Sequence, residues 1–265
     1  MSVQLVLDRK ISVEDKGEGI PIVFLHPPGL GKSVFMYQSH LSSSYRIITY
    51  DMCGHGFSDP ANGQVTIESL TEELLRLLDQ LQVEKAVICG YSAAGSVVQH
   101  FAITHPERVL GLILSGGFPY VKTFLKAEFL AGMKLLEFSP ALLSKILVIS
   151  HGKKKEEQEL LWKTVRKTNR KNWYDFYQAS YTYSCLDQLS RITVPVLVIY
   201  GDRVVHIKIF EEVYRHHLQQ PHIAIVKNAF HEVPIRKWNI FNQLVHEFIS
   251  SKIRCRNIFP VNRIQ

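Results

Sequence analysis

The 265-residue sequence has few of the features that define several protein classes. It contains only four cysteines, far apart and without a C-x-x-C pair, at Cys53, Cys89, Cys185 and Cys255. This spacing argues against a disulfide scaffold or a zinc ribbon and favours reduced thiols. No apolar run reaches the roughly 18 residues of a membrane-spanning helix. The N-terminal segment also carries acidic residues where a signal peptide is apolar. We therefore expect a cytoplasmic protein without a membrane span.

Basic residues exceed acidic ones by 31 to 24, a net charge of +7, but no nucleic-acid-binding motif accompanies them. We therefore expect no nucleic-acid partner. One basic group recurs at helical spacing and predicts a charged face on a single helix, at Lys163, Arg166, Lys167, Arg170 and Lys171. Such a face is either simply solvated or attracts an anionic ligand, an acidic protein or a membrane surface.

Short apolar runs alternate with amphipathic runs along most of the chain. Hydrophobic residues make up 46% of the sequence, enough for a large core. We expect a hairpin over residues 3–14 and buried strands at 20–25, 46–50, 86–90, 109–115, 195–200 and 223–226. Between them, Thr66 caps a helix with leucines at helical spacing. Strands that alternate with helices predict an α/β fold with a mostly parallel sheet covered on both faces.

Residues 118–191 interrupt this alternation. The segment is helical in character and rich in aromatic residues, and it falls between two expected strands. We interpret it as a helical cap inserted into a core formed by residues 1–117 and 192–253, although a long helical crossover fits the same pattern. Residues 254–265 read as a C-terminal tail.

The segment Cys89-Gly90-Tyr91-Ser92-Ala93-Ala94-Gly95 carries the clearest chemical signal. It follows an expected buried strand and opens an expected helix, which is the setting of a nucleophile elbow. A sharp strand-to-helix turn strains the serine backbone and requires small neighbours. The alternative is an ordinary turn in which Ser92 caps the helix.

Together with other motifs, this segment makes the sequence resemble the α/β-hydrolase family over nearly its whole length. The motifs follow one another in the family's order, as His26-Pro27-Pro28-Gly29, Asp51 to Pro60, the Ser92 segment, Tyr200-Gly201-Asp202-Arg203 and Asn228-Ala229-Phe230-His231. The resemblance implies an eight-stranded, mostly parallel sheet, a cap between strands 6 and 7 and a Ser–acid–His triad. It implies no metal or organic cofactor.

In this resemblance Ser92 is the nucleophile and His231 the general base. The acid is less clear, because the family's usual position, three residues after Gly201, holds Val204. Asp202 is our first choice for the acid. Glu232 and the absence of any acid partner are the alternatives.

The oxyanion loop also departs from the family pattern, because Pro28 has no N–H to donate. We expect the N–H of Ala93 as one donor, with Gly29 or Leu30 as the other. Four aromatic residues are candidates for an apolar substrate pocket, Tyr91, Phe118, Tyr120 and Phe124.

These features predict a serine hydrolase that cleaves a carboxylic ester or lactone of a small to medium, apolar molecule. Thioester and C–C bond cleavage use the same acyl chemistry. Because of Val204 and Pro28, the main alternative is a ligand-binding or signalling protein with feeble hydrolysis. A third possibility is a scaffold that binds an acidic protein through the basic face.

Overall fold

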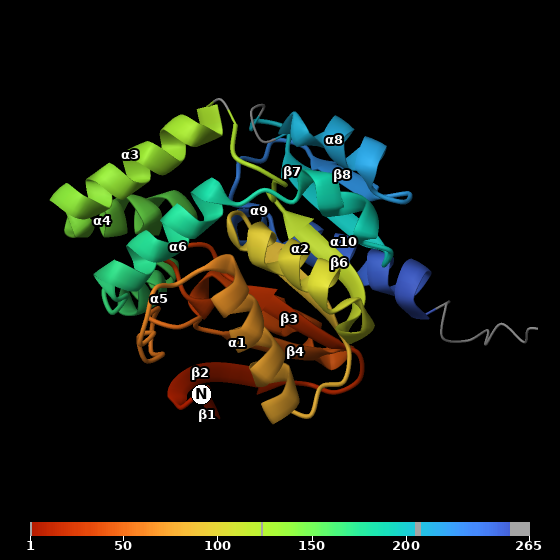
Figure 1. Ribbon diagram of the computed structural model, residues 1–265, viewed down its shortest axis with the longest axis horizontal. Coiled ribbons are helices and arrows are strands. Elements are labelled where there is room, and N and C mark those ends of the chain that lie inside the picture. Colours follow the sequence, from red (N-terminus) through yellow and green to blue (C-terminus); the bar gives the residue numbers. More distant parts are fainter. Residues whose placement is uncertain (1, 123, 205–207, 255–265) are drawn as a thin grey trace, which may run out of the picture.

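The computed structural model describes residues 2–122, 124–204 and 208–254. An eight-stranded sheet forms its centre, in the order β1-β2-β4-β3-β5-β6-β7-β8 (Figure 1). The β1–β2 and β2–β4 pairs are antiparallel and all other pairs are parallel. The predicted mostly parallel sheet is therefore confirmed. Its strands are β1 (Ser2–Val6), β2 (Arg9–Lys16), β3 (Pro21–Leu25), β4 (Arg46–Tyr50), β5 (Ala86–Tyr91), β6 (Val109–Ser115), β7 (Val196–Gly201) and β8 (His222–Val226).

Helices cover both faces of this sheet because its central strands are apolar on both sides. In β3, Val23 packs in the core beneath the first two helices, whereas Phe24 packs in the opposite core against Phe241. The core helices are α1 (Ile67–Gln80), α2 (Ala94–Thr104), α8 (Phe210–His217), α9 (Val233–Arg236) and α10 (Trp238–Phe248). Shorter turns are η1 (Lys32–Phe35), η2 (Gln38–Ser43), η3 (Pro106–Arg108), η4 (Leu186–Arg191) and the π-helical η5 (Ile249–Arg254).

Helix α1 illustrates how local sequence fixes these elements. The Thr66 side chain accepts a hydrogen bond from the Ser69 N–H, and the Ser69 side chain accepts one from the Thr66 N–H. This reciprocal pair satisfies two N–H groups that the helix itself leaves open. Leucines at helical spacing then bury one face of α1 against the sheet, at Leu70, Leu74, Leu77 and Leu78.

The described part of the segment between β6 and β7 contains α3 (Phe124–Phe138), α4 (Pro140–His151), α5 (Lys155–Val165) and α6 (Arg170–Thr182). Figure 1 shows these helices gathered on one side of the molecule, beyond the sheet. We propose that residues 118–191 act as a cap over the core. Apart from Arg254, the predicted tail lies outside the described residues. In the described ranges, no helix combines the length and apolar character needed to cross a membrane.

The predicted single basic helix is wrong. Helix α5 ends at Val165 and α6 begins at Arg170, with Asn169 between them as the N-cap whose side chain accepts from the Asn172 N–H. The cap interrupts the helical spacing, so the five basic residues do not share one face. Two of them have local partners instead, because Lys171 pairs with Asp175 at 2.6 Å and Lys167 lies 4.7 Å from the ring centre of Phe57.

Two histidines are buried beneath the loops that follow β3 and β4. His26 Nε2 accepts a hydrogen bond from the Met52 N–H at 3.0 Å, and His26 Nδ1 lies 3.0 Å from Pro27 O. Since a carbonyl can only accept, Nδ1 carries the proton. The His55 ring packs 5.0 Å from the His26 ring. Burial lowers the pKa of His26 to about 4 and that of His55 to about 3.

We expect the free energy of unfolding to fall as the pH drops from about 6.5 to about 4. The unfolded chain takes up a proton on each of these histidines near pH 6.5, whereas the folded protein resists protonation until lower pH. The steepest loss is roughly 2 to 3 kcal/mol per pH unit for the two groups. Urea unfolding at a series of pH values measures it. His55→Gln should reduce the dependence of the free energy of unfolding on pH, whereas replacement of the exposed residue, His216→Gln, should not. Equal pH dependence in the two variants would disprove the contribution of His55.

Candidate active site

Ser92 occupies a strained turn between β5 and α2. Its φ is +57°, a left-handed backbone conformation that is unfavourable for a residue with a side chain. The Ser92 N–H donates to Ser115 O at the end of β6, and Ser92 O accepts from the Gly95 N–H, both at 2.8 Å. These bonds hold the hydroxyl-bearing residue at the carboxyl edge of the sheet.

Small residues around Ser92 allow the helix to approach the strand. A Cβ on Gly90 would lie 2.6 Å from Val98 Cγ2, and a Cβ on Gly95 would lie 3.2 Å from Gly117 Cα. Ala94 is fully buried between them. The geometry is that of the predicted nucleophile elbow, with close packing as the reason for its small side chains.

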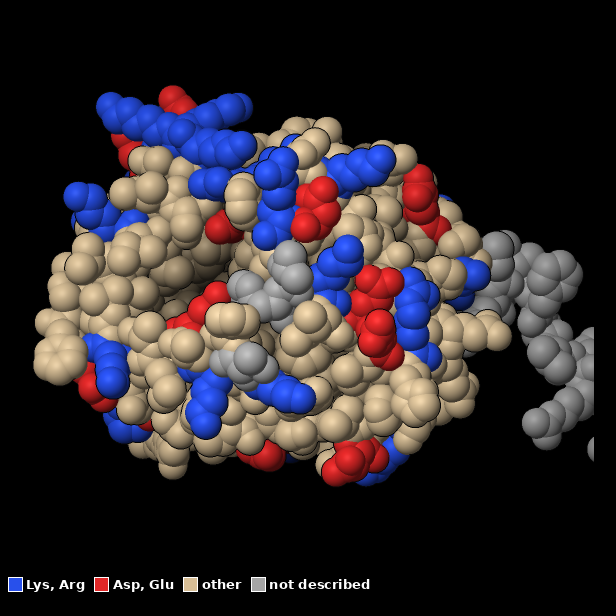
Figure 2. All heavy atoms as spheres, turned by 90° about the horizontal axis from the view of Figure 1, so that it is seen from above, with Lys and Arg blue, Asp and Glu red and all other residues tan. Residues whose placement is uncertain are grey.

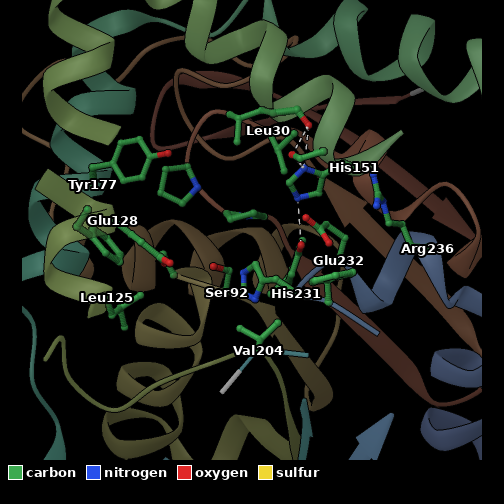
Figure 3. Close-up of a pocket in the computed structure, with 18 of the residues that line it drawn as sticks. Leu30, Ser92, Leu125, Glu128, His151, Tyr177, Val204, His231, Glu232 and Arg236 are labelled. Carbon is green, nitrogen blue, oxygen red and sulfur yellow. Dashed lines mark hydrogen bonds between the residues drawn. The ribbon is translucent and has the colours of Figure 1, made fainter. Parts of the chain in front are cut away.

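His231 follows β8 and lies beside Ser92, with the imidazole directed toward the serine (Figure 3). One side of its ring packs against Tyr91, with ring centres 5.2 Å apart. Gly116, which follows β6 and has a φ of +62°, contacts the ring as well. The ends of strands β5, β6 and β8 thus bring together the proposed nucleophile, the residues that pack against the imidazole and the proposed base.

We expect Gly116→Ala to lower hydrolytic turnover by about 10²-fold, the effect of displacing a reacting group by about 1 Å. The added Cβ would lie 2.6 Å from His231 Cε1 and 2.7 Å from Nδ1, so the ring must move. Gly63→Ala is the matched control, because nothing lies within 4 Å of a Cβ at that position. Initial rates and circular dichroism of both variants measure activity and fold. Full activity of a folded Gly116→Ala would contradict this placement of the ring.

Asp202, our first choice for the acid, and Val204, at the family's usual acid position, lie in different settings. Asp202 Oδ1 accepts from the Ala229 N–H at 3.2 Å, and backbone hydrogen bonds from Asn228 and Ala229 hold the pKa of Asp202 below its usual value. Asp202 thus ties two loops together, as expected of a turn residue. Val204, only 8% exposed, lines the cavity beside Ser92 and His231 (Figure 3). The role of Asp202 as the acid partner of His231 remains a proposal.

The loop after β3 forms a tight turn over residues 27–30. Pro28 occupies its second position, Gly29 its third with a φ of +80°, and Leu30 N–H donates to Pro27 O at 3.3 Å. This is the sequence pattern of a type II turn. The bond engages the Leu30 N–H, so Leu30 does not fit the predicted oxyanion role. We propose the N–H groups of Gly29 and Ala93 instead.

A cavity of about 610 Å³ opens above Ser92 and His231. Figure 2 shows it as a hollow in the surface with acidic side chains at its edge. One side is mainly apolar, with Leu125, Phe129 and Tyr177 from the proposed cap. The opposite side carries His151, Glu232 and Arg236, as Figure 3 shows.

Of the four predicted pocket aromatics, Tyr91 alone is among the described residues that line this cavity. Phe118 is buried against Phe129, Tyr120 packs on Phe210, and Phe124 is 69% exposed. Residues 118–124 belong to the start of the inserted segment, and the lining comes from further along its helices. Sequence reasoning missed Leu125 and Phe129 because helical spacing alone does not say which face a cap turns toward its core.

A family model described as alpha/beta hydrolase fold matches residues 20–149, which include strands β3 to β6 and the Ser92 turn. Solved structures with the same fold cover 94% of the chain. The chain has the α/β-hydrolase fold. The esterase EaEST from Exiguobacterium antarcticum has a TM-score of 0.85 at 21% identity, with 99% of its own chain covered. The enol-lactonase from Burkholderia xenovorans LB400 has a TM-score of 0.82 at 20% identity, with its whole chain covered.

Curated relatives of the chain have several names. A 2-hydroxymuconate semialdehyde hydrolase from Pseudomonas sp. (strain CF600) is 33% identical over 112 residues, which are 40% of each chain. The chain thus spans only about two fifths of the first relatives it matches. A putative 2-succinyl-6-hydroxy-2,4-cyclohexadiene-1-carboxylate synthase from Bacillus subtilis (strain 168) is 26% identical over 91% of this chain and 95% of its own.

In this α/β-hydrolase fold, His151 links the proposed cap to β5, the strand before the proposed nucleophile. Its Nδ1 lies 2.8 Å from Leu147 O and therefore donates, which leaves Nε2 to accept from the Tyr91 hydroxyl at 3.0 Å. Burial lowers the pKa of His151 to about 4, so the ring is neutral near pH 7. Tyr91 directly precedes Ser92, so this bond joins helix α4 to the turn that carries the proposed nucleophile.

Proposed function

We propose that this protein is a serine hydrolase that cleaves a carboxylic ester or lactone of a small to medium substrate. The observation that carries the proposal is the Ser92 turn, with its φ of +57°, facing His231 at the base of a 610 Å³ cavity. Strained backbone at a cavity floor is typical of a functional site.

In the proposed reaction, His231 removes the Ser92 hydroxyl proton as Oγ attacks the substrate carbonyl. The N–H groups of Ala93, at the start of α2, and of Gly29 stabilise the negative oxygen. His231 then gives its proton to the leaving alkoxide, and an acyl ester remains on Ser92. A water molecule, deprotonated by His231, hydrolyses this ester and restores the hydroxyl.

The carbonyl chemistry is common to esters, lactones and thioesters, and a C–C hydrolase uses the same residues after a different proton transfer. The largely apolar wall at Leu125 and Phe129 supports a substrate with an apolar part. It does not favour a highly polar sugar or a peptide chain.

A fluorophosphonate probe followed by peptide mass spectrometry tests the proposal. We expect a stoichiometric adduct on Ser92 within minutes, and none on Ser150, the other serine among the described residues that line the cavity. Ser92→Ala is the control and should show no adduct. A panel of esters and lactones then defines the bond that is cleaved. A folded protein that takes up no probe would refute the proposal.

A ligand-binding protein with feeble hydrolysis is the second candidate, favoured by Val204 at the cavity wall and by the engaged Leu30 N–H. Such a protein would bind its ligand equally well after Ser92→Ala and would keep its biological output. A catalyst would retain binding and lose turnover.

We expect Val204→Asp to raise ester turnover by about tenfold or more. Val204 lies beside His231, and a carboxylate there would orient the imidazole and stabilise its charged form. Val204→Asn is the matched control, since it has a similar shape without the charge. Measurements of kcat for both variants and for Asp202→Ala show whether a carboxylate at position 204 is a better partner of His231 than Asp202. An unchanged kcat in Val204→Asp, together with a large loss in Asp202→Ala, would show that Asp202 already serves as the acid.

A further inference from the structure

The polar side of the cavity contains two buried atoms that the mechanism does not use. Glu232 Oε2 and Arg236 Nε have no hydrogen-bond partner within the described part of the chain. Both residues line the cavity. Because an unpaired buried polar atom is costly, native proteins pair nearly all of them, and an exception calls for an explanation.

The two side chains are neighbours. The Arg236 N–H donates to Glu232 O at 2.8 Å, so the residues stand one helical turn apart and their side chains leave the same side of the chain. The Arg236 guanidinium is fixed by a second bond, from Nη2 to Ile149 O at 3.2 Å. That bond anchors the arginine to α4 and leaves Nε–H as a donor.

The charges of this pair select the kind of group it would bind. Arg236 offers a donor and Glu232 offers an acceptor, and one positive charge stands beside one negative charge. A carboxylate on the ligand would be repelled by Glu232, and an ammonium would be repelled by Arg236. A neutral group that both accepts and donates a hydrogen bond would pair with Arg236 Nε–H and Glu232 Oε2 at the same time.

We propose that Glu232 and Arg236 form a subsite for a hydroxyl group of the substrate. The hydroxyl oxygen accepts from Arg236 Nε–H and its proton is donated to Glu232. The apolar wall on the other side of Ser92 holds the hydrocarbon part, so the substrate class is a hydroxylated ester or lactone with an apolar portion. The identification of the ligand as an ester or lactone rests on the proposed function, whereas the recognition of a hydroxyl group does not.

Kinetics with matched substrates tests the subsite. The probes are p-nitrophenyl esters of straight-chain acids of six to eight carbons whose far end is methyl, hydroxyl or carboxylate. We expect kcat/KM for the best hydroxyl ester to exceed that of its methyl counterpart by about tenfold or more, since hydrogen bonds to charged groups are the stronger ones. Comparing substrates within one variant cancels any change in the catalytic step.

Two variants and a control separate the roles. Arg236→Met should reduce the hydroxyl-to-methyl ratio to about one. Glu232→Gln retains the shape but removes the repelling charge, so it should raise the carboxylate-to-hydroxyl ratio about tenfold. Arg203→Met removes a charge from the same cavity at an exposed position, where Arg203 pairs with Asn228, and should leave the ratio unchanged. A wild-type preference for the carboxylate ester, or an equal effect of Arg203→Met, would overturn the subsite.

A binding measurement keeps this test independent of hydrolysis. In the Ser92→Ala protein, calorimetry should show about tenfold tighter binding of ethyl 6-hydroxyhexanoate than of ethyl hexanoate, and adding Arg236→Met should abolish the difference. If the fluorophosphonate fails to label Ser92 but this preference holds, the hydrolase proposal fails and the subsite stands. Labelling of Ser92 with equal binding of the two esters disproves the subsite alone.

Discussion

Replacing His231 with glutamine should lower kcat for an ester substrate by on the order of 10⁴-fold or more. Glutamine has a similar reach but cannot take up the Ser92 proton. Without a base at that point, Ser92 must attack as a neutral hydroxyl, which is a weak nucleophile. Steady-state kinetics on an ester that binds both proteins measures the effect.

The KM should change much less than kcat. His231 is wedged between Tyr91 and Gly116, and its proposed role is proton transfer in the reaction rather than binding of the ester. The exposed His216→Gln on α8 is the matched control and should retain wild-type kinetics. If His231→Gln kept more than a tenth of the wild-type kcat, another group would have to be the base.

The parallel part of the sheet could be predicted from the sequence because its strands are short, largely apolar runs bounded by turn residues. In β5, the whole strand is buried, so periodicity and burial agree. The Ser92 turn was equally visible, since Gly90, Ala94 and Gly95 must be small for a helix to follow a strand so closely. In these places the local sequence and the tertiary packing impose the same requirement.

The errors arose where a tertiary contact overrides a local pattern. The basic residues from 163 to 171 have helical spacing, but Asn169 bonds through its N–H to Gly54 O and through its side chain to the start of α6. That contact with a loop more than 100 residues away ends one helix and starts the next. No periodicity within the segment contains this information.

The cavity wall was missed for a related reason. Leu125 and Phe124 are adjacent, yet Leu125 lines the cavity while Phe124 is exposed to solvent. Which of the two turns inward depends on how α3 packs on the helices beside it. The same holds for Glu232 and Arg236. Their proposed role follows from buried polar atoms that lack a hydrogen-bond partner in the described structure, and residue type alone does not indicate this.

Asp51→Asn should destabilise the fold by about 3 to 5 kcal/mol, the usual cost of removing one partner from a buried ion pair. The Asp51 carboxylate is completely buried and accepts from the Lys32 N–H and Lys32 Nζ, both at 2.8 Å, and from the Phe57 N–H at 3.1 Å. Lys32 is only 3% exposed, and its other hydrogen bond goes to Ser12 Oγ at 2.7 Å. Asparagine would leave this ammonium without a counter-charge and turn an NH₂ group toward donors.

The equilibrium free energy of unfolding in urea measures the loss. Asp15→Asn is the matched control, because it removes a partner of Arg46 at 2.7 Å in a pair whose side chains remain about one quarter exposed, and it should cost less than about 1 kcal/mol. The double variant Lys32→Met with Asp51→Asn should recover part of the stability, since no unpaired charge remains. A loss of unfolding free energy below about 1 kcal/mol for Asp51→Asn alone would show that the buried Lys32–Asp51 pair does not stabilise the fold as proposed.

The same ion pair joins the loop after β3 to the loop after β4. Lys32 follows the turn that holds Gly29, and Asp51 is the first residue after β4, in the loop that contains His55. A loosened pair would therefore shift the proposed oxyanion donor at Gly29 without touching Ser92 or His231. In a folded Asp51→Asn protein at low temperature, we expect slower fluorophosphonate labelling of Ser92, because the loop is then less well positioned. Unchanged labelling would show that the turn at residues 27–30 holds itself in place.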